Sequence, residues 1–441
     1  MATGPEPVTG ERPAENAVPV RRGRRRGVLT LAVCVVLLAA SSPFLWAGYH
    51  WYAGQAALDR YHSGAARGHL EKCLRVWPWT RSARTHLLAA RAARREGDFE
   101  EALRHLHTCR DALHDNSSES LLEWAMLRAA MGDLDTAAEP LKAAARQDPN
   151  QAPLVMEALA EGYLTMSRIL DALRTVDAWL ALEPDSVQAW AVRGKIHCRV
   201  GAAQEAAADF QHVVVRDPDY PHARLWLAQA LTEFGRYEEA VAHLEILHRR
   251  SPDNVDVRVQ LAICRQRMGH DEEARALLDR VLVEQPDRGL ALRERGRMAL
   301  SAGQFADAEI WLTRAVHVLP YDYKAQHALW ECLRQQDKTE AAEAQRLRAD
   351  ALYQRRPRQS EILTHLMSQK PDDPTLQCEL GGLFIQLGKP EVGEAWLLNV
   401  LRLDENYKPA LDALADYYRE RGNEDSSEEF RRRALGRSPK R

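Results

Sequence analysis

Histidine, cysteine and carboxylate side chains are the groups in this chain that could bind a metal ion or carry out acid–base chemistry. Sixteen histidines and seven cysteines occur among the 441 residues, and His105 and His107 are the closest histidine pair. Residues two apart on a helix point in different directions, so these two do not offer a shared metal site. The cysteines are widely spaced and include no Cys-x-x-Cys pair, which argues against a zinc site or a disulfide framework.

Acidic runs are also present, as at residues 271–273 and at Glu238 and Glu239. We expect these carboxylates to open helices, where they interact favourably with the positive end of the helix dipole. The chain has no phosphate-binding glycine loop, no His-Glu-x-x-His and no Gly-x-Ser-x-Gly motif. We therefore expect a protein that is not an enzyme, with no catalytic residue, no metal, no cofactor and no small-molecule substrate.

A glycine followed five residues later by an alanine recurs along the chain with a period near 34. A proline follows each of these glycines after seventeen residues. The four clearest sets are Gly201/Ala206 with Pro218, Gly235/Ala240 with Pro252, Gly269/Ala274 with Pro286, and Gly303/Ala308 with Pro320. A fixed period in this range indicates stacked copies of one supersecondary unit. Helix formers lie between the markers, so we expect an all-α fold, an α-solenoid of antiparallel helix pairs.

The repeated unit resembles the tetratricopeptide repeat, and the resemblance covers about residues 53–439. The clearest copy runs from Val187 to Tyr220, with small residues in its first helix and a glycine at its turn. The resemblance implies that small side chains pack where two helices cross and that the turn glycines adopt a positive φ. The residues expected in these packing roles are Gly194, Gly201, Ala206, Gly235, Ala240, Gly269, Ala274, Gly303 and Ala308.

One irregular step divides the array. Asp337 and Gly388 occupy equivalent turn positions but lie 51 residues apart, which is about half a period too long. Because Pro357 should interrupt a helix, we expect an inserted helix at 357–371 between a main array (53–356) and a C-terminal pair of repeats (372–441). The insertion is either a seam between two blocks or a tolerated addition without a role.

The N-terminal region has the pattern of a membrane anchor. Residues 28–49 contain no charged side chain and, as a helix, would span about 30 Å, the thickness of a bilayer core. Five arginines between positions 21 and 26 predict that the disordered tail at 1–27 stays cytoplasmic. The array would then lie outside the cell membrane on a single-pass signal-anchor helix. The alternative is a signal peptide that is cleaved near Ala40.

The resemblance also implies that ligands bind the concave surface built by the first helices. Basic residues at its exposed positions make it a candidate protein-binding face, and they are Arg91, Lys195, Arg199, Arg267, Arg293, Arg297, Lys324 and Arg334. An acidic peptide or protein surface would complement this face. The alternative is that these side chains are simply solvated. The net charge of −3 disfavours a general nucleic-acid binder, although a nucleic-acid-binding array remains a third hypothesis.

Together these features predict a membrane-anchored, non-enzymatic protein–protein interaction scaffold of a bacterial type. The combination of anchor and array resembles bacterial envelope assembly proteins, which implies a role in envelope or secretion-complex assembly. The alternative is an exported soluble repeat subunit of an enzyme or secretion complex, released by signal cleavage. Asparagine is absent from the first-helix positions that form the chaperone-binding clamp of some family members, so that activity is not expected.

Overall fold

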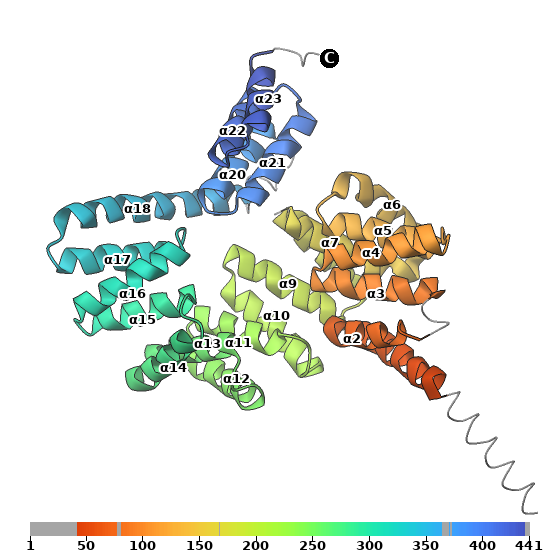
Figure 1. Cartoon of the computed structure of the whole chain (residues 1–441), viewed down its shortest axis with the longest axis horizontal. Coiled ribbons are helices and arrows are strands. Elements are labelled where there is room, and N and C mark those ends of the chain that lie inside the picture. The colour runs from red at the N-terminus through yellow and green to blue at the C-terminus, as the bar shows by residue number, and fades with distance from the viewer. Residues whose placement is uncertain (1–41, 77–80, 167, 364–369, 371–372, 437–441) are drawn as a thin grey trace, which may run out of the picture.

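The computed structural model describes residues 42–76, 81–166, 168–363, 370 and 373–436. Every regular element in these residues is a helix, and consecutive helices form antiparallel pairs that follow a curved path (Figure 1). The curve brings the last pairs back toward the first ones, since Arg402 in α21 forms an ion pair with Asp135 in α6 at 2.7 Å. The expected all-α solenoid is therefore confirmed over the described residues.

Residues 42–59 are helical and pair with α2 (Ser63–Cys73). The main array continues with α3 (Ala83–Glu96), α4 (Phe99–His107), α5 (Ser118–Ala130), α6 (Leu134–Gln147), α7 (Ala152–Thr165), α8 (Ile169–Leu182), α9 (Val187–Val200), α10 (Ala203–Arg216), α11 (Ala223–Glu233), α12 (Tyr237–Arg250), α13 (Val255–Arg267), α14 (Asp271–Glu284), α15 (Gly289–Ser301), α16 (Phe305–Val318), α17 (Tyr323–Gln335) and α18 (Thr339–Glu361). The C-terminal block comprises α20 (Pro374–Gln386), α21 (Pro390–Leu403), α22 (Lys408–Glu420) and α23 (Glu424–Ala434).

The turn inside each pair has the left-handed backbone that the glycines predict. Gly201, Gly235, Gly269 and Gly303 have φ angles of 79°, 86°, 85° and 72°. Residues with a Cβ atom rarely adopt this conformation, so glycine ends the first helix at little cost. Asp337 occupies the same turn between α17 and α18 with a φ of 55°, which an aspartate tolerates better than most residues.

The small residues of the repeat lie where two helices cross. Ala206, Ala240, Ala274 and Ala308 are all fully buried. At Gly194 a Cβ atom would stand 2.7 Å from the ring of Phe210 in the second helix of the same pair. Such close approach leaves no room for a larger side chain, because protein interiors are packed to near-crystalline density.

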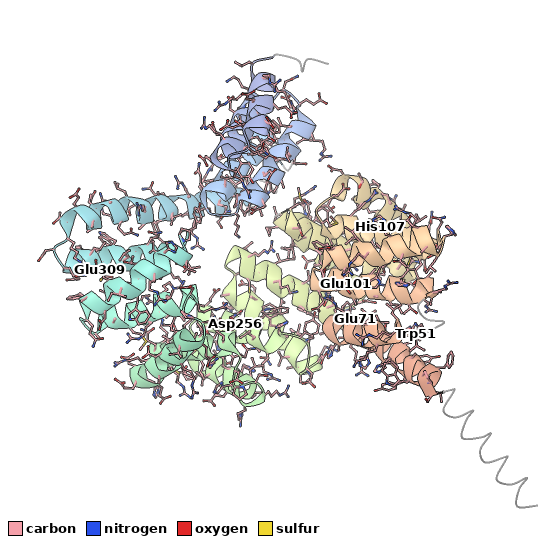
Figure 2. The ribbon with its side chains drawn as sticks, viewed as in Figure 1. Trp51, Glu71, Glu101, His107, Asp256 and Glu309 are labelled. Atoms are coloured by element: carbon pink, nitrogen blue, oxygen red, sulfur yellow. The ribbon has the colours of Figure 1, made fainter. Side chains whose placement is uncertain are left out.

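Partly exposed ion pairs connect neighbouring pairs of helices. Glu309 in α16 accepts a bond of 2.5 Å from Lys338 at the start of α18, and Asp256 in α13 pairs with Arg288 just before α15 (Figure 2). All four side chains retain contact with solvent. Each exposed pair contributes at most about 1 kcal/mol, so the apolar crossings and not these bridges hold the array together.

The helix that was expected to break at Pro357 does not break there. Instead α18 runs without interruption from Thr339 to Glu361 and includes Pro357 in its interior. An interior proline costs about 3 kcal/mol through its lost hydrogen bond. Contacts beyond the proline act against this cost, because Ile362 is fully buried in a cluster with Leu380 and Phe384 of α20. Arg358 also donates to both carboxylate oxygens of Glu379 in α20 at 2.6 and 2.9 Å. The predicted insert at 357–371 therefore begins inside α18, and much of its remainder lies outside the described residues.

The N-terminal predictions fall largely on residues that the structure does not describe. These include the tail at 1–27 and positions 28–41 of the predicted transmembrane helix. Its last positions belong to the helix at 42–59, in which Ala47 and His50 are buried. The expected boundary between anchor and array at residues 49–53 thus falls within one helix. Within the described part of the chain, no helix combines the length and the apolar character needed to cross a bilayer.

Candidate functional site

Three of the basic residues predicted to face a ligand are held by acidic residues of the array itself. Arg91 donates to Glu123 at 2.5 Å, and Arg297 pairs with Glu294 at 2.7 Å. Arg293 contacts both Glu294 at 2.7 Å and Asp322 at 2.5 Å, and only 11% of its side chain is exposed. The pairs of Arg91 with Glu123 and of Arg293 with Asp322 join neighbouring first helices, whereas Arg297 and Glu294 lie in the same helix. The charge of all three guanidinium groups is already compensated within the fold.

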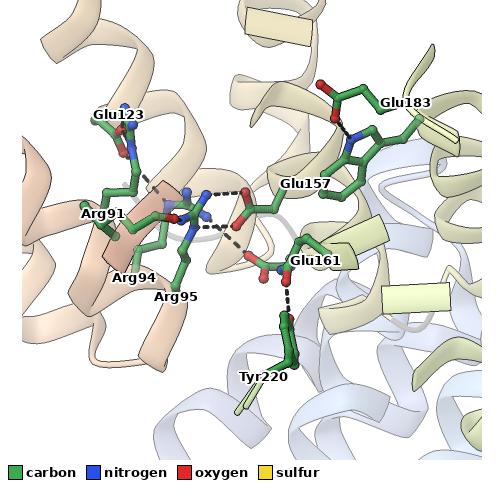
Figure 3. A network of polar contacts seen from close by, with 11 residues as sticks. Arg91, Arg94, Arg95, Glu123, Glu157, Glu161, Glu183 and Tyr220 are labelled. Carbon is green, nitrogen blue, oxygen red and sulfur yellow. Dashed lines mark hydrogen bonds and ion pairs between the residues drawn. The ribbon is translucent and has the colours of Figure 1, made fainter. Parts of the chain in front are cut away.

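A buried network around Arg95 joins the first helices of the N-terminal repeats (Figure 3). Arg95 in α3 donates to both oxygens of Glu157 in α7, with both distances 2.7 Å. Arg94 reaches Glu161 at 3.2 Å. Burial favours the neutral form of Glu157, but the charges of Arg95 and Arg94 outweigh it and lower the pKa of that carboxyl group. The pair of Arg95 and Glu157 is therefore ionised, and it ties α3 to α7. Burial and the nearby charge of Glu157 raise the pKa of Glu161.

The concave surface beside this network is filled by the chain's own N-terminal turn. The guanidinium of Arg95 lies over the ring of Tyr61 at 4.3 Å and also donates to the carbonyl of Leu58 at 2.9 Å. Tyr61 packs against the apolar clusters around α8 to α12. His62 reaches Asp217, between α10 and α11, at 3.2 Å. This part of the surface is consequently not open to a partner.

The open part of the concave side is a hollow of about 1160 Å³. It lies between the middle repeats, which here means the helices from α9 to α18, and the C-terminal block, and we call it the inner hollow. Its charged lining residues are Glu233, Arg267, Arg293, Glu294, Arg297, Asp322, Lys324, Arg356 and Lys389. A second hollow of about 630 Å³ shares Arg267, Arg297 and Lys324 with it and adds Glu331. The structure thus brings four of the eight predicted basic residues together.

The other predicted basic residues lie apart from that lining. Lys195 is half-buried, with its ammonium group 4.5 Å from the centre of the Trp226 ring. Arg199 donates to the carbonyl of Leu164 at 2.6 Å. Arg334 lies over the ring of Trp330 at 5.8 Å. Basic residues at equivalent first-helix positions therefore have different environments. The neighbouring residues determine whether each side chain packs on an aromatic ring, forms an ion pair or remains without a counter-charge.

Sequence reasoning missed two basic residues of the inner hollow, Arg356 and Lys389. Both come from beyond the regular repeats: Arg356 lies near the end of the long helix α18, and Lys389 precedes α21 in the C-terminal block. Because the step between Asp337 and Gly388 does not follow the repeat period, the period does not predict where these two residues lie relative to the main array. The only sequence signal was that Lys389 follows the turn glycine Gly388, a position that no other argument singled out.

The groups that could do chemistry are poorly suited to it in this setting. Cys198 lines the inner hollow, but burial, with help from Glu233, raises the pKa of its thiol to about 11. A thiol of that pKa is almost fully protonated at neutral pH and is a weak nucleophile. Among the described residues, no three histidine, cysteine or acidic side chains gather closely enough to hold a metal ion.

His105 and His107 take different surroundings, as their spacing predicts. The Nδ1 atom of His105 lies 2.9 Å from that of His86 in α3. Burial and the neighbouring His86 lower the pKa of His105 to about 4. His107 is exposed and contacts Asp111 at 3.3 Å. The two rings therefore do not converge on one site.

Comparison with known protein families gives matches in the middle of the chain. Models of the tetratricopeptide repeat match residues 157–221, 199–248 and 231–295. A comparison with curated protein sequences gives no match.

Among solved structures, similar folds include the human IFIT1 dimer with m7Gppp-AAAA, at 16% identity and a TM-score of 0.42, over 80% of this chain and 90% of that chain. PilW, a widely conserved type IV pilus biogenesis factor, is 21% identical with a TM-score of 0.39, over 44% of this chain and 90% of its own. YrrB, a protein with an unusual peptide-binding site, is 18% identical with a TM-score of 0.35, over 43% of this chain and 96% of its own. The family models identify tetratricopeptide repeats within residues 157–295, and the same pairing of helices continues on both sides of them.

Proposed function

We propose that this protein is a membrane-anchored, non-enzymatic scaffold that docks partner proteins in its inner hollow. Tetratricopeptide repeats indicate a protein–protein interaction scaffold. The observation that carries the proposal is the lining of the hollow, in which basic side chains outnumber acidic ones six to three. A positively charged recess attracts acidic partners and orients them as they approach.

The architecture suits a docking platform. Each helix pair is held by fully buried small residues such as Ala240 and Ala274, and the buried pair of Arg95 and Glu157 fixes the first repeats. A rigid array loses little conformational entropy on binding because its surface is preformed. More of the contact energy therefore contributes to affinity.

The anchor is proposed from the sequence of residues 28–49, which carries no charge over a length sufficient for a bilayer. The arginines that precede it support an orientation with the array on the extracytoplasmic side of the cell membrane. Tethering raises the effective concentration of partners that bind the same surface. Assembly of an envelope or secretion complex is a process that uses such a concentrator.

Fractionation of cells that express the full chain with a C-terminal tag tests the anchor. The scaffold hypothesis predicts a full-length product that stays in the membrane fraction through a high-salt wash and enters solution with detergent. A shorter product in the soluble fraction would show signal cleavage and favour the exported soluble subunit. A matched control replaces Leu37 and Leu38 by Arg, which should release an anchored protein from the membrane because a charged side chain in the bilayer core is costly.

Docking is tested by cross-linking and mass spectrometry on the detergent-solubilised full chain. Partner peptides cross-linked to residues that line the inner hollow would support the proposal. Cross-links confined to the outer surfaces of the second helices would reject the hollow as the docking surface.

A further inference from the structure

We propose that Arg267, Lys324, Arg356 and Lys389, which we call the seam cations, form one binding site for the carboxylates of an acidic segment in a partner protein. Arg267 and Lys324 belong to first helices of the main array, Arg356 belongs to the long helix α18, and Lys389 lies inside the C-terminal block. This inference rests on the proposed docking function. It adds the location of the binding site and the type of peptide sequence that binds there.

The seam cations come from four separate elements but line a single recess. Arg267 ends α13, Lys324 lies in the first turn of α17, Arg356 is near the end of α18 and Lys389 directly precedes α21. All four line the inner hollow and are exposed there. The contact of Tyr321 with the turn at Gly388 holds the C-terminal block against the middle repeats at this place.

The seam cations differ from the other basic residues of the hollow in their lack of internal counter-charges. Arg293 and Arg297 are paired with Glu294. Among the described residues, the seam cations form no ion pair within 4.0 Å, and their side chains donate no hydrogen bond. The ammonium group of Lys389 lies 6.0 Å from the centre of the Phe384 ring. Free cations that share a recess are the groups a carboxylate can engage without first displacing a partner.

The electrostatic setting of Lys389 supports this assignment. Although Lys389 is accessible to solvent, the surrounding protein partly desolvates its ammonium group and lowers its pKa, and the charges of Arg199 and Arg356 lower it further. Like charges that repel one another in a recess are stabilised when an anion binds between them. Lys389 therefore gains more from a bound carboxylate than a lysine on an open surface would.

The size and the polar lining indicate a peptide segment. The inner hollow of about 1160 Å³ adjoins the second of about 630 Å³, and their combined volume is larger than the roughly 300–1,000 Å³ of sites for small molecules. Gln229, Gln260 and Gln359 also line the hollow, and their amides can bond to the backbone of an extended chain. A lining that combines cationic and amide groups suits an acidic peptide.

A nucleic acid fits the recess less well. Glu233 lies in the inner hollow, and Glu331 in the second hollow. Each would lie near a phosphate chain and repel it, whereas a peptide can place an uncharged residue there. The chain as a whole carries a net charge of −3, without the strong positive field that favours polyanions.

Fluorescence anisotropy with the full chain in detergent tests the site. The probe is a labelled peptide of about twelve residues that alternates Glu and Gly, long enough to cross both hollows when extended. Its control carries Gln in place of Glu, and a labelled oligoadenylate RNA of about the same length tests the nucleic acid. We expect the Glu peptide to bind at least about tenfold more tightly than the Gln peptide, a difference of about 1.4 kcal/mol.

The decisive variant is the double substitution Arg356→Glu and Lys389→Glu. We expect it to weaken binding of the Glu peptide by about tenfold or more. The matched control, Arg249→Glu with Arg280→Glu, reverses two exposed charges on the second helices α12 and α14, outside the hollow. It should change the affinity by less than about twofold. Circular dichroism and thermal melting of both variants check that each is folded.

Equal affinities for the Glu and Gln peptides would overturn the inference, as would equal losses in the two double variants. Tighter binding of the RNA than of the Glu peptide, lost in the seam variant alone, would assign the site to nucleic acid instead. Cross-linked partners that remain on the seam variant as on the native chain would reject the site and leave the scaffold function standing. A native chain that cross-links no partner would reject the function itself.

Discussion

The ring of Tyr321 lies against the backbone of Gly388, and a Cβ atom at Gly388 would overlap that ring. Tyr321 is in the turn between α16 and α17, and Gly388 is in the turn between α20 and α21. The two turns are far apart in sequence, and their contact forms part of the wall of the inner hollow. The position of the C-terminal block therefore depends on a residue without a side chain.

Replacing Gly388 by Ala should lower the free energy of unfolding by about 2–3 kcal/mol and weaken binding of the acidic peptide. The φ of 78° accounts for about 1–2 kcal/mol of this loss, and the overlap with Tyr321 adds the rest. Gly422→Ala is the matched control, because its φ is 73° but nothing lies within 4 Å of its Cβ position. Denaturant titration measures both, and equal losses in the two variants would contradict the role of the Tyr321 contact.

Leucine in place of Ala274 should destabilise the array by about 1–3 kcal/mol through overpacking. Ala274 is fully buried where α13 and α14 cross. The control is Ala276→Leu in the same helix, where the side chain is exposed and the change should stay within about 0.5 kcal/mol. Thermal melting compares them. An unchanged melt of the Ala274 variant would show that this crossing is not tightly packed.

Charge reversal should affect stability at the ion-paired cations of the hollow and peptide binding at the unpaired ones. Arg293→Glu places an acid beside Glu294 and Asp322, which now hold the guanidinium at 2.7 and 2.5 Å. We expect a loss of about 3 kcal/mol or more, because two acids lose their partner. Arg267→Glu breaks no ion pair and should leave Tm nearly unchanged while it weakens peptide binding. A lower Tm in the Arg267 variant than in the Arg293 variant would contradict this division.

The stability of the N-terminal repeats should fall as the pH falls from about 6.5 to about 4. Burial and His86 hold the pKa of His105 at about 4, below the value of about 6.5 in the unfolded chain. The unfolded state therefore binds the proton first, and stability is complete above about pH 6.5 and lost below it. The loss should reach about 2–3 kcal/mol. Glu101, at 3.7 Å, and Arg67 also face this ring.

Denaturant titrations across this pH range check the effect. The variant His105→Gln should show a flatter dependence than the native chain, since it lacks the buried titrating ring. His107→Gln, which removes an exposed histidine on the same helix, should leave the slope unchanged. Identical slopes for the native chain and the His105 variant would assign the pH dependence to other groups.

Most of the repeat could be predicted from the sequence because its markers act locally. A glycine such as Gly235 is needed where a helix ends in a left-handed turn, and an alanine such as Ala240 is needed where two backbones approach. Both requirements act within one helix pair. Pro357 was misjudged because the outcome at this position is not local: Ile362, beyond the proline, is buried against residues of α20, and Arg358 contacts Glu379 there.

The sequence by itself determined the helix pairs, their period and the order in which they stack, because each follows from sterics within about one repeat. Only the tertiary structure decided which cations remain free, since the partner of Arg293 lies in the next pair and Lys389 reaches the hollow from beyond an irregular step. A charge is free or compensated according to what lies within a few ångströms of it. Distances of that kind across the curve of the array are set by the packing of all the pairs between, and no single segment encodes them.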